Sequence, residues 1–122
     1  MTTHVCSHLR ELVKTQIPAI EASIEKNRYY LGRISGHYIG LDEATDDFNT
    51  KHLLPYWGKI FKALYCTYKC PDGNSCEIEK RNHAIAKTFR AEIKEFGIDK
   101  ILEGGDETEK IFTKFRERTE DS

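Results

Sequence analysis

The sequence lacks any long hydrophobic run. No stretch approaches the roughly 18 consecutive apolar residues that a membrane-spanning helix needs, and residues 1–10 have no apolar centre of the kind found in secretory signals. Charged residues make up 32% of the chain. We therefore expect a cytoplasmic protein that has no membrane segment.

A large net charge of either sign is also missing. Nineteen basic residues stand against twenty acidic ones, which gives a formal net charge of -1. So small a charge produces no overall field that would attract nucleic acid or an anionic membrane. Contact with nucleic acid would have to come from a local basic patch.

The sequence motifs of several enzyme classes are absent as well. The chain has no H-E-x-x-H zinc motif, no glycine-rich phosphate loop, no C-x-x-C-H haem attachment and no G-x-S-x-G nucleophile turn. A di-iron helical bundle would show Glu-x-x-His pairs on two helices, and the chain contains none. These absences favour a binding or redox protein over an enzyme.

No segment shows the alternation of apolar and polar residues that is typical of β-strands. Apolar residues recur instead at intervals of three, four or seven, the spacing of amphipathic helices. A chain of 122 residues has room for one hydrophobic core. We predict an all-α fold with one domain, residues 1–122, and a frayed tail from about residue 117. Three main helices and a short C-terminal helix would form a small bundle.

The first predicted helix covers Thr3–Ile34. Pro18 lies within it and predicts either a kink or two abutting helices, because proline cannot complete the hydrogen-bond ladder. The polar stretch Leu41–Thr50 is expected to form a loop, with room for one helical turn. A second helix is predicted to begin around Leu53–Tyr56, with a proline in its first turn, and to end near Lys69.

Two pairs of residues have the spacing of a capping box, in which a polar side chain and a glutamate three positions later satisfy backbone groups at a helix start. Asn74 and Glu77 form the first pair and open a third helix that ends before Gly97. Asp106 and Glu109 form the second pair and open the C-terminal helix.

Cysteine spacing is the strongest chemical signal in the chain. Cys66, Cys70 and Cys76 fall within eleven residues, and Cys6 lies sixty positions before Cys66. In a reducing cytoplasm, clustered cysteines indicate metal ligands before disulfides. Cys66 and Cys70 on one helix face would also hold their Cβ atoms about 5 to 6 Å apart, farther than the about 3.8 Å of a disulfide.

An iron-sulfur cluster suits this spacing somewhat better than zinc does. Zinc sites usually use C-x2-C pairs, whereas a four-iron cluster holds its cysteines farther apart and tolerates irregular gaps. We expect Cys6 to be the fourth ligand, with His4 and His8 beside it as substitutes. Structural zinc, and free thiols that bind no metal, remain the alternatives.

One distant cysteine followed by a tight trio locally resembles the WhiB-like iron-sulfur regulators. The trio of that family is written C-x2-C-x5-C, and here it is C-x3-C-x5-C, from Cys66 to Cys76. The resemblance covers Cys6 and these eleven residues. It implies that such a pattern holds an iron-sulfur cluster within a small helical protein.

A set of basic side chains follows helical spacing just after the cysteine trio. Such a face would meet phosphates or an acidic protein, but glutamates flank it, as on an ordinary solvated helix. Its members are Lys80, His83, Lys87, Arg90 and Lys94.

The sequence therefore predicts a small helical protein that binds a 4Fe-4S cluster through Cys6, Cys66, Cys70 and Cys76 for redox sensing or electron transfer. A metal-free interaction or adaptor module is the alternative, with a protein partner or a second copy of the chain on the basic face or on the chain's many tyrosines. Nucleic acid is a weaker candidate as partner.

Overall fold

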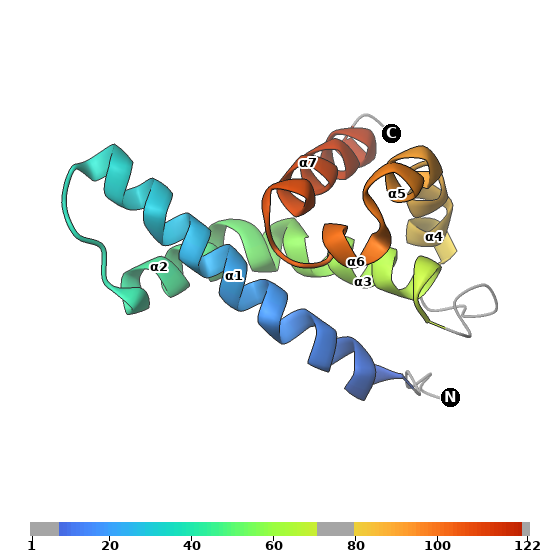
Figure 1. The fold of residues 1–122 in the computed structure, drawn as a ribbon, viewed down its shortest axis with the longest axis horizontal. Coiled ribbons are helices and arrows are strands. Elements are labelled where there is room, and N and C mark those ends of the chain that lie inside the picture. The colour runs from blue at the N-terminus through green and yellow to red at the C-terminus, as the bar shows by residue number, and fades with distance from the viewer. Residues whose placement is uncertain (1–7, 71–79, 121–122) are drawn as a thin grey trace.

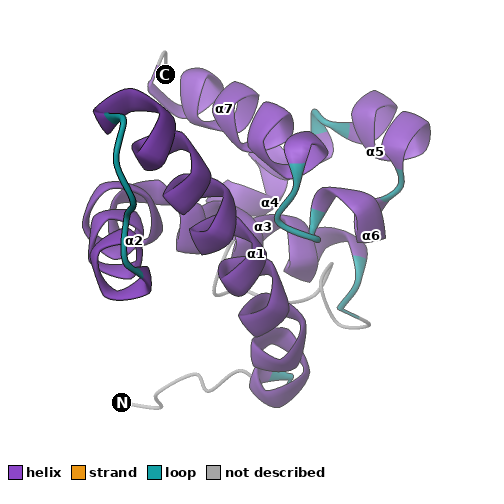
Figure 2. Cartoon of the chain, turned by 60° about the vertical axis from the view of Figure 1, so that its left-hand side comes forward, coloured by secondary structure: helices purple, strands orange, loops and turns teal. Residues whose placement is uncertain are grey.

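The computed structural model describes residues 8–70 and 80–120, with backbone only for residues 80–83 and 119–120. All regular structure in these ranges is helical (Figure 2), which confirms the all-α prediction. The elements in chain order are α1 (Leu9–Ser35), α2 (Leu41–Phe48), η1 (Asn49–Trp57), α3 (Gly58–Tyr68), α4 (Lys80–Lys87), α5 (Arg90–Phe96), α6 (Ile98–Ile101) and α7 (Asp106–Glu120).

Helix α1 crosses the run formed by α2, η1 and α3, and α4 to α7 gather around α3 (Figure 1). Helix α1 continues unbroken through Pro18, so the alternative of two abutting helices is wrong. The buried side of α1, which faces the rest of the molecule, carries Leu12, Ala19 and Ile24. The helix ends at Gly36, whose positive φ of 74° is a conformation that glycine adopts without steric cost.

The loop expected at Leu41–Thr50 is helical instead. Acidic residues in the first turn of α2 stabilise it through the helix dipole. Ala44 and Phe48, four positions apart, are buried, and the Asn27 side chain of α1 donates hydrogen bonds to Ala44 O at 3.3 Å and Asp47 Oδ2 at 2.9 Å. Tertiary contacts therefore order a stretch whose composition indicated a loop.

Helical structure continues from α2 into η1, a nine-residue π-helical segment that joins α2 to α3. The predicted start of a helix around Leu53–Tyr56 is therefore wrong. Pro55 lies inside η1. If this segment were an α-helix, the proline ring would clash with the carbonyl group of the residue four positions earlier. The wider π-helical turn accommodates that residue, and π-helical turns are frequent at functional sites.

Aromatic rings connect η1 and α3 to α7. The Trp57 ring stacks on Phe61 with their centroids 5.2 Å apart and lies 5.4 Å from Phe112 of α7. Phe61 stacks in turn on Tyr65, one helical turn farther along α3. Such aromatic pairs add about 0.5 to 1.5 kcal/mol each beyond the area that they bury.

The helix predicted to end before Gly97 is interrupted at Thr88 and Phe89, so a single helix through this region is wrong. Phe89 is fully buried and stacks on Phe115 of α7 at 5.4 Å. The Arg118 side chain donates a hydrogen bond to Thr88 Oγ1 at 2.7 Å, which fixes the turn from outside. The predicted ending at Gly97 is confirmed, with a φ of 83°. The start expected at Asn74 and Glu77 lies outside the described residues.

The C-terminal helix α7 begins at Asp106, as predicted, and reaches Glu120, past the expected start of the frayed tail. A tight connection at Gly104 places it against α1. Gly104 has a φ of 89°, and a Cβ there would collide with the carbonyl oxygen of Ala19. Its N–H donates to Thr108 Oγ1 at 2.8 Å, so the turn depends on a residue without a side chain.

Replacing Gly104 with alanine should lower the free energy of unfolding by at least about 2 kcal/mol, because the substitution adds both backbone strain and a clash with α1. Gly105→Ala is the matched control. Open space surrounds Gly105, so that variant should lose about 1 kcal/mol at most. Urea unfolding followed by circular dichroism measures both, and equal losses would contradict this role of Gly104.

Candidate functional site

Two of the four predicted cysteine ligands lie in the described residues, both at the end of α3. Cys66 is buried within the helix, and Cys70 is half-buried just beyond it. The Cys70 N–H donates to Tyr65 O at 3.0 Å, which extends the helical turn past Tyr68. Neither thiol is in a disulfide. Cys6, Cys76 and His4 lie outside the described residues.

The start of α1 lies beside this end of α3. Tyr65 is the link, because the side chain of Thr15 reaches its hydroxyl, and Glu11 and Cys70 act on it electrostatically. Burial is the largest influence and raises the pKa of the Tyr65 phenol, Thr15 opposes the rise, and Cys70 and Glu11 add to it. Residues near the start of α1 and Cys70 therefore both interact with Tyr65. His8, the predicted substitute ligand, directly precedes α1.

Within residues 8–70 and 80–120, no three side chains of histidine, cysteine, aspartate or glutamate are grouped closely enough to hold a metal ion. The two cysteines at α3 are therefore not joined by a third such ligand from the described part of the chain. The four-cysteine site stays a prediction that depends on Cys6 and Cys76.

The predicted basic face is divided between two helices. Lys80, His83 and Lys87 belong to α4, whereas Arg90 and Lys94 belong to α5 beyond the interruption. The interruption lies at Thr88 and the buried Phe89. Lys87, Arg90 and Lys94 are exposed. Binding of a partner to these residues stays a prediction.

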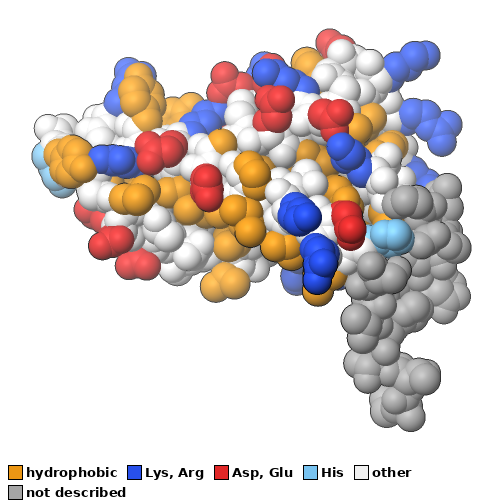
Figure 3. All heavy atoms as spheres, turned by 60° about the horizontal axis from the view of Figure 1, so that its bottom comes forward, with side chains coloured by type: hydrophobic (Ala, Val, Ile, Leu, Met, Phe, Trp, Pro, Cys, Tyr) orange, Lys and Arg blue, Asp and Glu red, His pale blue; other side chains and the backbone are white. Residues whose placement is uncertain are grey.

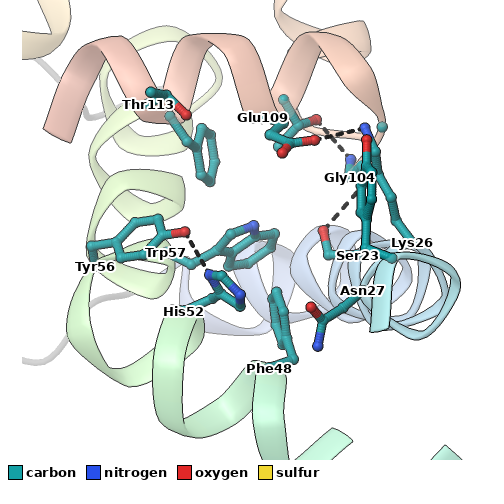
Figure 4. Close-up of a pocket in the computed structure, with 14 residues that line it drawn as sticks. Ser23, Lys26, Asn27, Phe48, His52, Tyr56, Trp57, Gly104, Glu109 and Thr113 are labelled. Carbon is teal, nitrogen blue, oxygen red and sulfur yellow. Dashed lines mark hydrogen bonds and ion pairs between the residues drawn. The ribbon is translucent and has the colours of Figure 1, made fainter. Parts of the chain in front are cut away.

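A pocket that the sequence did not indicate lies between α1, the α2–η1 run and the start of α7 (Figure 4). Its volume is about 270 Å³, near the lower end of the roughly 300 to 1,000 Å³ that is typical of small-molecule sites. Its aromatic lining includes Phe48, His52, Tyr56, Trp57 and Phe112. The π-helical segment η1 contributes three of these residues, which are far in sequence from those on α1 and α7.

His52 is the titratable group on the η1 side of this pocket. Burial lowers the pKa of its imidazole, although the charge of Asp47 acts in the opposite direction. Its Nδ1 and the Tyr56 hydroxyl are 2.8 Å apart (Figure 4), and the two rings meet edge to face. The lowered pKa keeps His52 neutral at pH 7 and suited to hydrogen bonding.

Lys26 of α1 is the cation at the opposite side of the pocket. Its Nζ is 2.8 Å from Glu109 Oε2 and also contacts Asp106. Burial favours the neutral amine, but hydrogen bonds and charges from the two carboxylates outweigh burial and raise the pKa of Lys26. Two carboxylates thus compensate one ammonium group, and no excess positive charge remains at this side.

Comparisons with family models, with curated proteins and with solved structures found no match to this chain. In the described part of the chain, no helix is long and apolar enough to cross a membrane.

The lowered pKa of His52 predicts an acid-sensitive fold. In the unfolded chain His52 takes up a proton near pH 6.5, whereas in the folded chain it does so only at lower pH. The unfolded state therefore binds more protons as the pH falls through 6.5, and stability decreases. Urea unfolding of the wild type from about pH 7.5 to about pH 5 should show this decrease, and His52→Gln should reduce its slope. Parallel pH profiles for the two proteins would refute this role of His52.

Proposed function

We propose that this chain binds a 4Fe-4S cluster through Cys6, Cys66, Cys70 and Cys76, for redox sensing or electron transfer in the reducing cytoplasm. One observation supports the proposal most strongly. The Tyr65 hydroxyl of α3 is reached by Thr15 of α1, and Glu11 of α1 and Cys70 both act on it electrostatically, near the end of α3 that also carries Cys66. Two elements distant in sequence, each adjoining predicted ligands, thus meet at one end of the bundle.

Chain connectivity adds to this support. Cys6 precedes His8 by two residues, and two residues span about 7 Å at most. A cluster site beside the start of α1 would therefore be within reach of Cys6. Cys76 follows Cys70 by six residues, a gap within the irregular spacing that iron-sulfur clusters tolerate.

The donor set fits a soft metal centre. Thiolates are the ligands that iron-sulfur clusters use, and a cluster held by them supplies one-electron chemistry. Structural zinc with the same thiolates, or with His4 or His8 in place of one, is the closest alternative. The wider Cys66–Cys70 gap, compared with the usual C-x2-C pair of zinc sites, favours the cluster.

Anaerobic purification of the full chain tests the proposal. The protein should be brown, with about four iron atoms and four sulfides per chain. Cys70→Ser should abolish the colour and most of the bound iron. Thr67→Ser is the matched control, because it changes a residue between the two described thiols and leaves every sulfur in place. It should retain the cluster.

Three results would contradict the cluster. One colourless zinc ion per chain, with unfolding by a chelator, would indicate the structural zinc site. Protein free of iron and zinc would remove the metal altogether. A Cys6→Ser variant that retains its full content of iron and sulfide would show that Cys6 is not a ligand of the cluster.

A metal-free interaction module is the second candidate. Leu9, Val13 and Ile17 follow one another at four-residue intervals on α1 and are 39–50% exposed. Figure 3 shows exposed hydrophobic side chains between charged ones on the underside of the molecule as Figure 1 presents it. Apolar side chains on one helix face suit a protein partner or a second copy of the chain. Metal-free protein with four titratable thiols and unchanged helicity would favour this candidate.

A further inference from the structure

The indole N–H of Trp57 is a hydrogen-bond donor at the aromatic wall of the pocket. The Trp57 side chain is only 4% exposed, and Phe48, Phe61 and Phe112 surround its ring. Figure 4 shows the nitrogen edge of the ring facing the pocket. Tryptophan in a core usually pairs this group, and an acceptor on a bound ligand would pair it here. The pocket therefore presents a polar group suited to a ligand acceptor.

Flat apolar surfaces surround that donor. Phe48 and Phe112 line the pocket, and each packs against the Trp57 ring. Tyr56 and His52 complete the η1 wall (Figure 4). Rings of this kind contact a planar aromatic molecule by offset stacking or edge-to-face packing. The volume of about 270 Å³ limits the occupant to a small molecule.

Polar groups across the pocket determine the charge of the occupant. Lys26 is already compensated by Glu109 and Asp106, so the pocket offers no free cation for an anionic ligand. The Asn27 amide nitrogen is engaged by α2, and its Oδ1 accepts no hydrogen bond from the described residues. This oxygen suits a ligand N–H, as the Trp57 N–H suits a ligand carbonyl.

We propose that this pocket binds a small, neutral, planar aromatic compound that carries an amide or lactam group. The carbonyl oxygen accepts from Trp57 Nε1–H, the amide N–H donates to Asn27 Oδ1, and the ring packs between Phe48 and Phe112. This site is separate from the proposed cluster, because it lies at the start of α3 whereas Cys66 and Cys70 lie at its end.

Benzamide is a suitable probe, because it combines one aromatic ring with a neutral amide. Trp57 is the single tryptophan of the chain, so its fluorescence reports on the pocket directly. Benzamide should change this fluorescence in a saturable way and raise the thermal midpoint. Benzoate, which is anionic, and toluene, which has no amide, should bind more weakly.

Variants test the assigned contacts by calorimetry. Trp57→Phe keeps an aromatic ring but removes the donor, and it should weaken benzamide binding about fivefold, the usual effect of one neutral hydrogen bond. Thr113 is exposed at the pocket edge, so Thr113→Phe should obstruct the pocket without disturbing the core and abolish binding. Thr113→Ser is its matched control and should bind as the wild type does.

Four results would overturn the proposal. The first is no saturable benzamide binding to the folded wild type. The second is undiminished binding to Thr113→Phe, and the third is benzoate or toluene binding as tightly as benzamide. The fourth is unchanged affinity in Trp57→Phe. Cys70→Ser should bind benzamide normally, so failure of the cluster and failure of the pocket are distinguishable.

Discussion

Burial of α3 is the constraint on which the rest of the structure depends. Lys59 is the single exposed residue of this helix, and Phe61 and Leu64 have no accessible surface. A helix that is apolar on nearly all sides must be covered on nearly all sides. Helix α1 lies against it from one direction and α4, α6 and α7 from others. Each large side chain so buried stabilises the fold by about 1.5 to 3 kcal/mol.

The two ends of α3 carry different chemistry. At its start, Trp57 completes η1 and directs an indole donor into an aromatic pocket. At its end, Cys66 and Cys70 lie beside the first turns of α1. The stack from Trp57 through Phe61 to Tyr65 runs along the helix between these ends. One rigid element therefore positions both proposed sites, although they share no side chain.

Local signals in the sequence were sufficient for the fold class and for helix ends set by glycine or capping residues, as at Gly97. They failed where distant contacts decide the structure. Leu41–Phe48 is helical because α1 covers its apolar side, and the break at Phe89 follows from burial of that ring against α7. The cysteine pattern was visible because cysteine is a rare residue type and three cysteines stand at short spacing. The pocket was not, because nothing in the sequence links Trp57 to Asn27 until folding places them around one cavity.

In the proposed cluster site, four thiols meet at one end of the bundle, where the start of α1 adjoins the end of α3. Anomalous X-ray scattering at the iron absorption edge, from anaerobically grown crystals, tests it most directly. We expect a single strong iron peak beside Cys66 and Cys70, next to the first turn of α1. An iron peak elsewhere, or no iron while α1 and α3 pack as described, would contradict it.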